Sequence, residues 1–416
     1  MTREDMCRVA RMSLGVCDCL CLELATGFGK TRIALSCANA VCAALRERGK
    51  RASVLILVAK TVHKDEWRRE IAKWGGLMAD DVVIECYESL RKHAGERYSV
   101  ILSDEGHHLS EARREVLAGM SFVKLVLLSA TMPMGLKDWL RGRWRVNVLS
   151  VGLPEAIRDD VLPEPVICLL PLSFDDGVTE TITRNGGKGL PVVECPWERR
   201  WDFMRRKDVE VRVRCAKRQY LDDLDSSIGW FRDKSLSGHG WARFRWLRLC
   251  KDRLEWLSSL KNPLLLSLLS RLDGVRAITF CSTIGQAESL GEHCVHSGNG
   301  LSGKVLDAFN RGDVNHVTAV NILNEGCNLV DCQVGIFANV TSSEIITRQR
   351  SGRLLRHPHP VMIMPYWAGT REEELIKKHL EDYDKELIKV IDGVGVDGPW
   401  DWLDSLISEG NDTIQE

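Results

Sequence analysis

The sequence lacks a surplus of charge of either sign. Its 57 lysine and arginine residues almost balance its 58 aspartate and glutamate residues. Proteins that bind nucleic acid over much of their surface carry a basic excess, so the overall composition gives no sign of such a partner. A polyanion would therefore have to bind a local basic patch.

Long apolar runs and a cysteine framework are also missing. The sequence contains no run of about 18 apolar residues, the length that predicts a membrane span. The opening Met-Thr-Arg-Glu-Asp does not resemble a secretion signal. The 15 cysteines form no paired Cys-x-x-Cys pattern, which predicts reduced, buried thiols. Cys17, Cys19 and Cys21 alternate in an apolar run, a spacing that fits a strand better than a metal site. We expect a cytoplasmic, intracellular protein with no membrane partner.

Apolar runs alternate with helical periodicity in two parts of the chain. In the first third, residues 53–58, 100–103 and 124–128 are typical of strands buried on both faces. A second alternating region begins near residue 276 and has similar runs at 317–321, 333–338 and 361–365. Each region predicts a parallel α/β sheet whose ligand lies at the carboxyl ends of the strands.

The middle of the chain, residues 159–261, begins with prolines and becomes rich in tryptophan and arginine. Tryptophans at helical spacing are typical of a core, whereas exposed ones beside arginines would stack bases and neutralise phosphates. Both interpretations stay open. We predict an α/β domain at 1–150, a mainly helical connector or insert at 151–262, a second α/β domain at 263–396 and a frayed acidic tail at 397–416.

A glycine-rich loop follows the strand-like residues 16–24. Residues 25–31 read Ala-Thr-Gly-Phe-Gly-Lys-Thr. Such a loop turns backbone N–H groups toward a triphosphate, while Lys30 supplies an ammonium and Thr31 a hydroxyl for Mg²⁺. A chance Gly-Lys-Thr turn is the alternative. The phosphate-binding candidates are Thr26, Gly27, Phe28, Gly29, Lys30 and Thr31.

Two adjacent acids end the strand-like residues 100–103. Asp104 is placed to bind Mg²⁺, and Glu105 to position or deprotonate an attacking water. His107 follows them, and Ser-Ala-Thr stands at 129–131 after the next strand. Two acids alone are also common in solvated loops, but their place after a phosphate loop favours hydrolysis of a nucleoside triphosphate.

An arginine block at residues 349–356 reads Gln-Arg-Ser-Gly-Arg-Leu-Leu-Arg. Arg353 and Arg356 are one helical turn apart, so both can face the same γ-phosphate across a domain cleft. Domain closure would then depend on nucleotide. A basic surface helix is the alternative. Gln349 and Gly352 argue against it, because they stand at the positions expected from the family resemblance given below.

Together these blocks resemble the superfamily 2 DEAD/DEAH-like helicases and translocases. Residues 320–328 are similar to the fifth motif of the DNA-directed branch, which includes restriction-enzyme motor subunits, XPB-like proteins and the phage helicase UvsW. Residues 59–61, followed by Trp67 and Glu70, resemble motif Ia of Swi/Snf-like and restriction-type motors. The resemblance covers about 15–150 and 260–375 and implies two tandem RecA-like P-loop NTPase domains. It also implies that an arginine and a glutamine upstream of the phosphate loop read adenine, and Arg3 stands at about that distance without a glutamine.

The resemblance implies ATP and Mg²⁺ as cofactors and nucleic acid as partner, with DNA preferred as a single strand, fork or junction. It assigns a catalytic role to Lys30, Glu105, Arg353 and Arg356, and adds Gln349 to the nucleotide site. It assigns the coupling of hydrolysis to nucleic-acid contact to His107, Ser129, Thr131, Glu325 and Gly326. It assigns direct nucleic-acid contact to Lys60, Thr61 and Thr283.

We therefore expect an ATP-dependent DNA helicase or translocase, of a compactness that fits a phage-encoded protein, working alone or with further subunits. An RNA-dependent ATPase of the same architecture is one alternative. A nucleotide-gated clamp that binds nucleic acid without turnover is another. Lys30, Glu105 and Arg356 are all present, which argues against the clamp, because a related protein that has lost ATPase activity usually lacks one of these residues.

Overall fold

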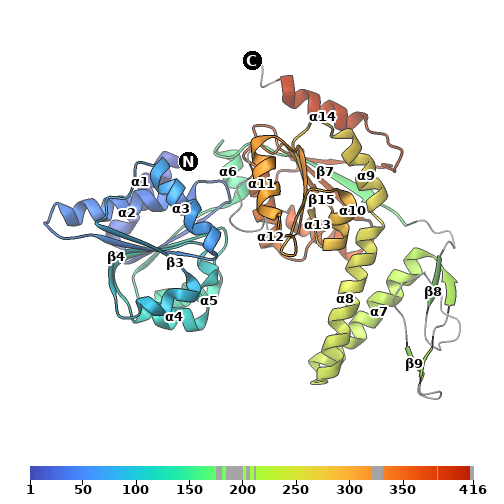
Figure 1. Cartoon of the computed structure of the whole chain (residues 1–416), viewed down its shortest axis with the longest axis horizontal. Helices are drawn as coiled ribbons and strands as arrows, with labels where there is room; N and C mark the ends of the chain where they lie inside the picture. Colours follow the sequence, from blue (N-terminus) through green and yellow to red (C-terminus); the bar gives the residue numbers. More distant parts are fainter. Residues whose placement is uncertain are drawn as a thin grey trace.

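The structure is a computed structural model that describes residues 1–174, 180–183, 200–202, 207–209, 212–320, 329, 331–381 and 383–412. It contains two α/β units with parallel sheets, and a helical hairpin projects from the second unit (Figure 1). The predicted fold, two parallel-sheet domains with a mainly helical insert, is confirmed. None of the described helices is long and apolar enough to cross a membrane.

The first unit is a six-stranded parallel sheet in the order β3-β2-β4-β5-β1-β6. The strands predicted from apolar runs are present at the expected residues. In chain order the elements are α1 (Arg3–Val16), β1 (Cys19–Leu24), α2 (Lys30–Arg46), β2 (Ser53–Val58), α3 (Thr61–Lys73), β3 (Asp81–Cys86), the 3-10 helix η1 (Tyr87–His93), β4 (Arg97–Ser103), the 3-10 helix η2 (Gly106–His108), α4 (Glu111–Ala118), β5 (Ser121–Ser129), α5 (Met134–Arg141), β6 (Val146–Val151) and α6 (Leu153–Arg158).

Helices cover both faces of this sheet, which explains why its strands are apolar on both sides. Ile33 of α2 packs on one face and Leu136 of α5 packs on the other. Cys19 and Cys21 are fully buried strand residues on the α5 side. The strand prediction is therefore correct for Cys19 and Cys21. Cys17 is also buried, but it caps the end of α1 and precedes the strand.

The second unit is a seven-stranded parallel sheet in the order β13-β14-β12-β15-β16-β7-β17. All but one of its strands follow the insert in the sequence. These later elements are α9 (Asn262–Arg271), β12 (Ala277–Cys281), α10 (Ile284–Leu290), β13 (Cys294–Val295), α11 (Ser302–Arg311), β14 (His316–Val320), β15 (Val334–Phe337), α12 (Glu344–Leu354), β16 (Val361–Trp367), α13 (Arg371–His379), the 3-10 helix η4 (Lys385–Leu387), β17 (Ile388–Val390) and α14 (Asp401–Asp412).

The remaining strand, β7 (Val166–Leu172), comes from the range predicted as connector, 151–262. It lies between β16 and β17, so the second unit takes residues from both sides of the insert. Pro163 and Pro165 precede an apolar run here, and they mark the start of a strand rather than a loop. The structure therefore differs from the predicted start of the second domain at residue 263.

The predicted frayed tail at 397–416 is wrong over most of its described length. Residues 401–412 form the helix α14, and Trp400, Leu403 and Leu406 are buried in the core of the second unit. The acidic residues that suggested a tail alternate with these apolar ones, which is the pattern of an amphipathic helix.

The described residues of the insert form two short antiparallel strand pairs and one long helical hairpin. β8 (Glu180–Thr183) pairs with β11 (Arg212–Cys215), and β9 (Arg200–Asp202) pairs with β10 (Lys207–Val209). The hairpin consists of α7 (Lys217–Leu236) and α8 (Gly240–Ser259). At its base, Tyr220, Leu224 and Trp256 pack against Trp367 at the end of β16.

A buried ion pair fixes the base of this hairpin to the second unit. Lys261, just after α8, has no exposed side chain, and its Nζ lies 2.8 Å and 3.1 Å from the two carboxylate oxygens of Glu372. The same Nζ donates to the carbonyls of Pro365 at 2.9 Å and Ala338 at 3.2 Å. Burial lowers the pKa of Lys261, and Glu372 opposes that shift. The ammonium is thus fully hydrogen-bonded away from water, as a buried charge requires.

Replacing Glu372 with glutamine should destabilise the protein, because the Lys261 ammonium would stay buried without its countercharge. Loss of one partner of such a pair costs about 3–5 kcal/mol, so we expect a clearly lower melting temperature by differential scanning fluorimetry. Glu374→Gln, at an exposed position on the same helix, is the control and should melt like the unmodified protein. Equal melting of the Glu372→Gln variant and the unmodified protein would contradict this role.

Candidate active site

The phosphate-loop candidate connects the end of β1 to the start of α2. Gly27 and Gly29 have φ angles of 90° and 98°, which residues with a side chain rarely adopt. Phe28, between them, is fully buried and anchors the loop in the core. Because α2 begins at Lys30, its N-terminal N–H groups lie directly behind the loop and form an anion-binding position.

Lys30 lies where the loop, the acids and the arginines meet. Its Nζ donates to the carbonyl of Leu24 at 3.1 Å. Although part of its side chain stays accessible to solvent, the surrounding protein lowers its pKa by burial, and Arg353 and Arg356 lower it further. Glu105 and Asp104 act in the opposite direction. An anionic phosphate at this place would replace the hydration that the ammonium has lost.

Asp104 and Glu105 form a crowded pair of carboxylates at the end of β4. Asp104 Oδ1 accepts a hydrogen bond from the Glu105 backbone N at 3.0 Å. Burial and the neighbouring Glu105 raise the pKa of Asp104 to about 6. Glu105 has a φ of 47°, a left-handed conformation that is uncommon outside glycine and concentrated at functional sites. A bound cation would relieve the repulsion between the two carboxylates.

Two aromatic side chains hold Asp104 in place. Trp67 of α3 donates from Nε1 to Asp104 Oδ2 at 2.8 Å. The hydroxyl of Tyr87 donates to the Asp104 backbone carbonyl at 2.6 Å and lies 2.7 Å from Ser103 Oγ. The sequence placed Trp67 in a motif, but it did not reveal this bond, because the contact of α3 with the end of β4 is tertiary.

Glu105, His107 and Ser129 form a triangle that joins the acidic pair to the Ser-Ala-Thr loop. Ser129 Oγ lies 3.5 Å from Glu105 Oε2 and 3.3 Å from His107 Nδ1, and His107 Nδ1 lies 3.5 Å from the same Glu105 oxygen. Ser129 also donates to the Thr131 carbonyl at 2.6 Å. The structure thus brings together residues that the sequence predicted separately as catalytic and coupling residues.

The arginine block lies directly against the phosphate loop. A Cβ built on Gly352 would lie 2.3 Å from Thr26 Cβ and 2.9 Å from the Thr26 carbonyl, and one built on Gly27 would lie 3.4 Å from the Gly352 carbonyl. The two units therefore touch backbone to backbone. Arg353 is buried in the last turn of α12. Arg356 follows the helix and stays accessible to solvent, while burial in the cleft and the Arg353 guanidinium lower its pKa to about 10.

Glu66 of α3 is an acid near these arginines that the sequence analysis missed. Burial raises the pKa of Glu66, and the charges of Arg353 and Arg356 oppose that shift. Its position one residue before Trp67 was the available signal, because the same helix carries the residues resembling motif Ia. Glu66 supplies a countercharge to the arginine block.

Arg3 ties the N-terminus to the phosphate loop. Its guanidinium donates to the carbonyls of Phe28 at 3.2 Å, Gly27 at 3.3 Å and Val161 at 2.9 Å. Arg3 also lines a cavity of about 490 Å³ together with residues 160–164 and 355–358. The cavity adjoins the loop, so a base attached to a bound triphosphate can lie there.

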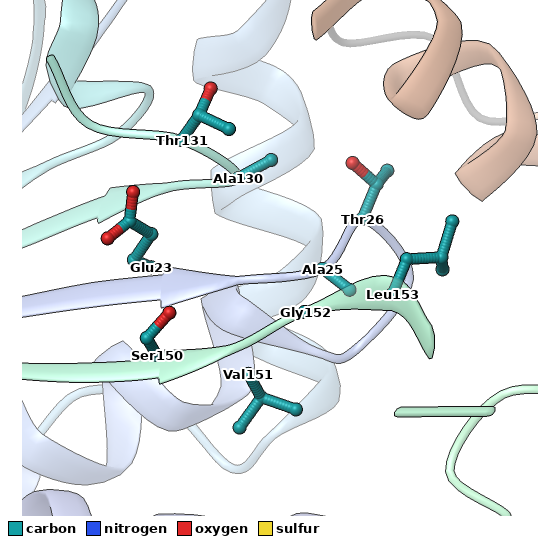
Figure 2. A pocket seen from close by; sticks show the side chains of 9 residues that line it. All are labelled: Glu23, Ala25, Thr26, Ala130, Thr131, Ser150, Val151, Gly152 and Leu153. Carbon is teal, nitrogen blue, oxygen red and sulfur yellow. The ribbon is translucent and has the colours of Figure 1, made fainter. Parts of the chain in front are cut away.

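A smaller cavity of about 90 Å³ lies between the phosphate loop and the Ser-Ala-Thr loop (Figure 2). Its lining includes Glu23 of β1, Thr131 and Ser150 of β6. Glu23 accepts a hydrogen bond from the Met132 backbone N at 2.8 Å and forms a 2.8 Å ion pair with Lys137. Glu23 thereby fixes the Ser-Ala-Thr loop to the strand that leads into the phosphate loop.

The other predicted site residues lie apart from this cluster or outside the described residues. Lys60 and Thr61 are at the start of α3, and Thr283 is the N-cap of α10 and accepts a hydrogen bond from the Gln286 backbone N at 3.2 Å. Glu325 and Gly326 lie outside the described residues. Gln349 is in α12, and its side chain is likewise outside the description.

Asp104→Asn should raise the melting temperature at neutral pH in buffer with EDTA and without nucleotide. The folded pKa of about 6 exceeds the ordinary value of Asp, so ionised Asp104 costs stability. That cost is absent below pH of about 4 and complete above the folded pKa. The advantage of the variant should therefore grow from pH 4 to pH 7 in thermal melts. Asp138→Asn, at an exposed position, is the control and should show no such trend. A melting-temperature difference that does not grow with pH in Asp104→Asn would contradict the buried-charge interpretation.

Comparisons with known proteins agree with this geometry. Residues 18–134 match the family model described as "Type III restriction enzyme, res subunit", and residues 260–358 match "Helicase conserved C-terminal domain". The two matched segments lie on the first and second α/β units and together span just over half of the chain. A search of the curated proteins finds no significant match.

Three solved structures illustrate the shared fold. S. cerevisiae Dbp5 bound to RNA and ADP BeF3 has a TM-score of 0.57 and 10% identity, covering 97% of this chain and 93% of its own. The Pyrococcus furiosus Hef helicase domain has a TM-score of 0.50 and 14% identity, covering 91% and 99%. The Type ISP restriction-modification enzyme LlaBIII bound to DNA has a TM-score of 0.53 and 13% identity, covering 98% of this chain but only 32% of the enzyme.

At such low identity these structures support the fold alone, and the family follows from the sequence. Two helicase-type family models match in the same order as the two α/β units, and each matched segment carries one side of the phosphate-loop and arginine contact. The chain therefore belongs to the DEAD/DEAH-like helicases of superfamily 2, which are nucleic-acid-dependent ATPases.

Proposed function

We propose that the chain is an ATP-dependent DNA helicase or translocase that uses Mg²⁺ and couples DNA-stimulated hydrolysis to unwinding or remodelling of DNA. The contact between Thr26 and Gly352 carries this proposal. It holds Arg353 and Arg356 close enough to Lys30 to affect its pKa. Cations from both units therefore converge where the phosphates of a nucleotide would bind.

The residues present fit a magnesium ion. The Thr31 hydroxyl and the Asp104 carboxylate are oxygen donors of the kind that Mg²⁺ prefers. Burial and the neighbouring Glu105 raise the pKa of Asp104, so a cation at this place would stabilise the ionised carboxylates. When bound, Mg²⁺ neutralises charge on the β- and γ-phosphates.

The protein side chains would then carry out the hydrolytic step. Glu105 takes a proton from the attacking water as oxygen bonds to the γ-phosphorus and the bond to the β–γ bridging oxygen breaks. Lys30, Arg353 and Arg356 stabilise the charge on the transferring group. His107 and Ser129 limit the orientations of the Glu105 carboxylate. ADP and phosphate are the products.

The preference for DNA rests on the first family model, which is named for a restriction enzyme. Of the similar folds, LlaBIII was solved with DNA and Dbp5 with RNA, so an RNA-dependent ATPase is the alternative. Lys60, Thr61 and Thr283 lie at the N-termini of α3 and α10. Backbone N–H groups at such ends bind phosphates without regard to sequence, which suits a motor that moves along a strand.

Steady-state ATP hydrolysis should be stimulated by one form of DNA when no polymer, single-stranded, duplex and forked DNA, and RNA are compared. Glu105→Gln should still bind ATP and DNA but lose hydrolysis by at least about 100-fold, because it cannot take the proton from water. Stronger stimulation by RNA would replace DNA in the proposal. ATP binding without turnover on every polymer would favour the clamp, and full activity of Glu105→Gln would overturn the role of Glu105.

Gly352→Ala should lower kcat strongly, because the added methyl group cannot fit against Thr26 and must push the arginine block away from the phosphate loop. Misplacing catalytic groups by about 1 Å can cost about 100-fold in rate. Nucleotide binding to the first unit should change less. The control is Gly303→Ala in α11, where a Cβ would meet open space. An unchanged kcat in Gly352→Ala would show that catalysis does not need this close contact.

A further inference from the structure

The tip of the α7–α8 hairpin exposes an unusual amount of aromatic surface. Trp230, Trp241 and Phe244 are 51%, 60% and 75% exposed. At the opposite end of the hairpin, Trp256 is 9% exposed and belongs to the core. The tip points away from the second α/β unit (Figure 1). Large aromatic side chains gathered at an exposed end mark an interaction site.

The aromatic rings at the tip support one another. The Trp230 and Phe231 rings lie edge to face with centroids 4.8 Å apart, and the Trp241 ring lies 6.3 Å from Trp230 and 6.0 Å from Phe231. This mutual packing restricts the rings while leaving much of their surface open. A ligand that stacks on them therefore finds rigid faces and loses less entropy on binding.

The charge of the tip is strongly positive. Residues 229–248 carry five basic side chains and one acidic side chain, in a chain whose net charge is −1. Arg243, Arg245 and Arg248 alternate with the aromatics on α8. Arg248, the one farthest from the tip, also pairs with Asp252 at 3.8 Å. Lys234 lies over the Trp230 ring at 5.7 Å. Like charge disfavours a second copy of the same tip as occupant, whereas phosphates are complementary to it.

We propose that this tip, residues 229–248, is a second nucleic-acid site that stacks unpaired bases on Trp241, Trp230 and Phe244 while the arginines bind the adjoining phosphates. This chemistry is that of single-strand binding: aromatic faces accept any base, and cations follow the backbone. The inference rests on the proposed function and specifies a second contact for the same polymer.

The base of the hairpin ties this second site to the motor. Gln286 Nε2 donates to the Ser258 carbonyl at 3.0 Å, and Trp367 Nε1 donates to the Leu257 carbonyl at 3.2 Å. Gln286 lies on α10, the helix capped by Thr283. With the buried Lys261, these bonds make α8 a rigid extension of the second unit. Any movement of that unit during the ATP cycle moves the stacking site with it.

The test is binding of the full-length protein to fluorescent oligonucleotides, measured by anisotropy. Trp241→Ser combined with Phe244→Ser should weaken binding to single-stranded DNA by at least about 10-fold, as expected for loss of stacked bases. Binding to blunt duplex and ATP hydrolysis without polymer should be little changed. The single change Trp241→Phe keeps a ring, so this variant should bind single-stranded DNA almost as tightly as the unmodified protein. Trp74→Ser, at an exposed tryptophan of the first unit, is the control and should bind like the unmodified protein.

Further outcomes separate this inference from the proposed function. If DNA stimulates the ATPase but the double variant binds single strands normally, the second site is wrong and the motor proposal stands. An equal loss of affinity for blunt duplex would also overturn stacking. If the unmodified protein neither binds nor responds to any nucleic acid, both proposals fail. Loss of a dimer in sedimentation velocity, with DNA binding unchanged, would make the tip a self-association surface instead.

Discussion

The close approach of two backbones at Thr26 and Gly352 determines the geometry of the whole site. Only glycine fits at 352, because any Cβ there would overlap the phosphate loop. The same helix is fixed from beneath, since a Cβ on Gly335 would lie 2.1 Å from Leu354 Cδ1. α12 thus packs closely between β15 and the phosphate loop, because glycine stands at both contacts, Gly335 and Gly352. The position of Arg353, between Gly352 and Leu354, follows from these two contacts.

The helix α3 links three parts of the proposed motor. Lys60 and Thr61, the proposed nucleic-acid contacts, lie at its start. Further along the same helix, Trp67 donates a hydrogen bond to Asp104 at the end of β4. The preceding residue, Glu66, interacts electrostatically with the arginine block. Because a helix moves as a rigid element, a shift at its N-terminus also shifts Trp67, which holds the proposed metal ligand Asp104, and Glu66, which balances the arginines. Nucleic-acid contact and the state of the nucleotide site can therefore influence each other through one element.

The range of an interaction along the chain decided whether the sequence could reveal it. The parallel strands and the phosphate loop are encoded in local runs, so apolar periodicity and spacing were enough to predict them. β7 was missed because its partners, β16 and β17, lie far along the chain. The bond between Trp67 and Asp104 and the packing of Trp400 against the second unit are likewise tertiary. Local periodicity predicts an amphipathic helix, but it does not say which of two similar residues meets the core.

The tryptophans of the insert show this limit most clearly, and they also explain how a nearly neutral chain can bind a polyanion. Trp241 and Trp256 lie on one helix, yet one is exposed and the other is core. Their separation of fifteen residues corresponds to about 22 Å along the helix axis. That distance exceeds the Debye length of about 8 Å at physiological ionic strength. Asp225, near the hairpin base, pairs with Arg253 at 2.6 Å. Arg243 lies ten residues, or about 15 Å, further toward the tip, so that acid is too distant to cancel its charge. Arg248, lower on the helix, pairs with Asp252 at 3.8 Å. A net charge of −1 describes the sum over the chain, whereas a DNA strand would interact only with the charges within reach of each contact.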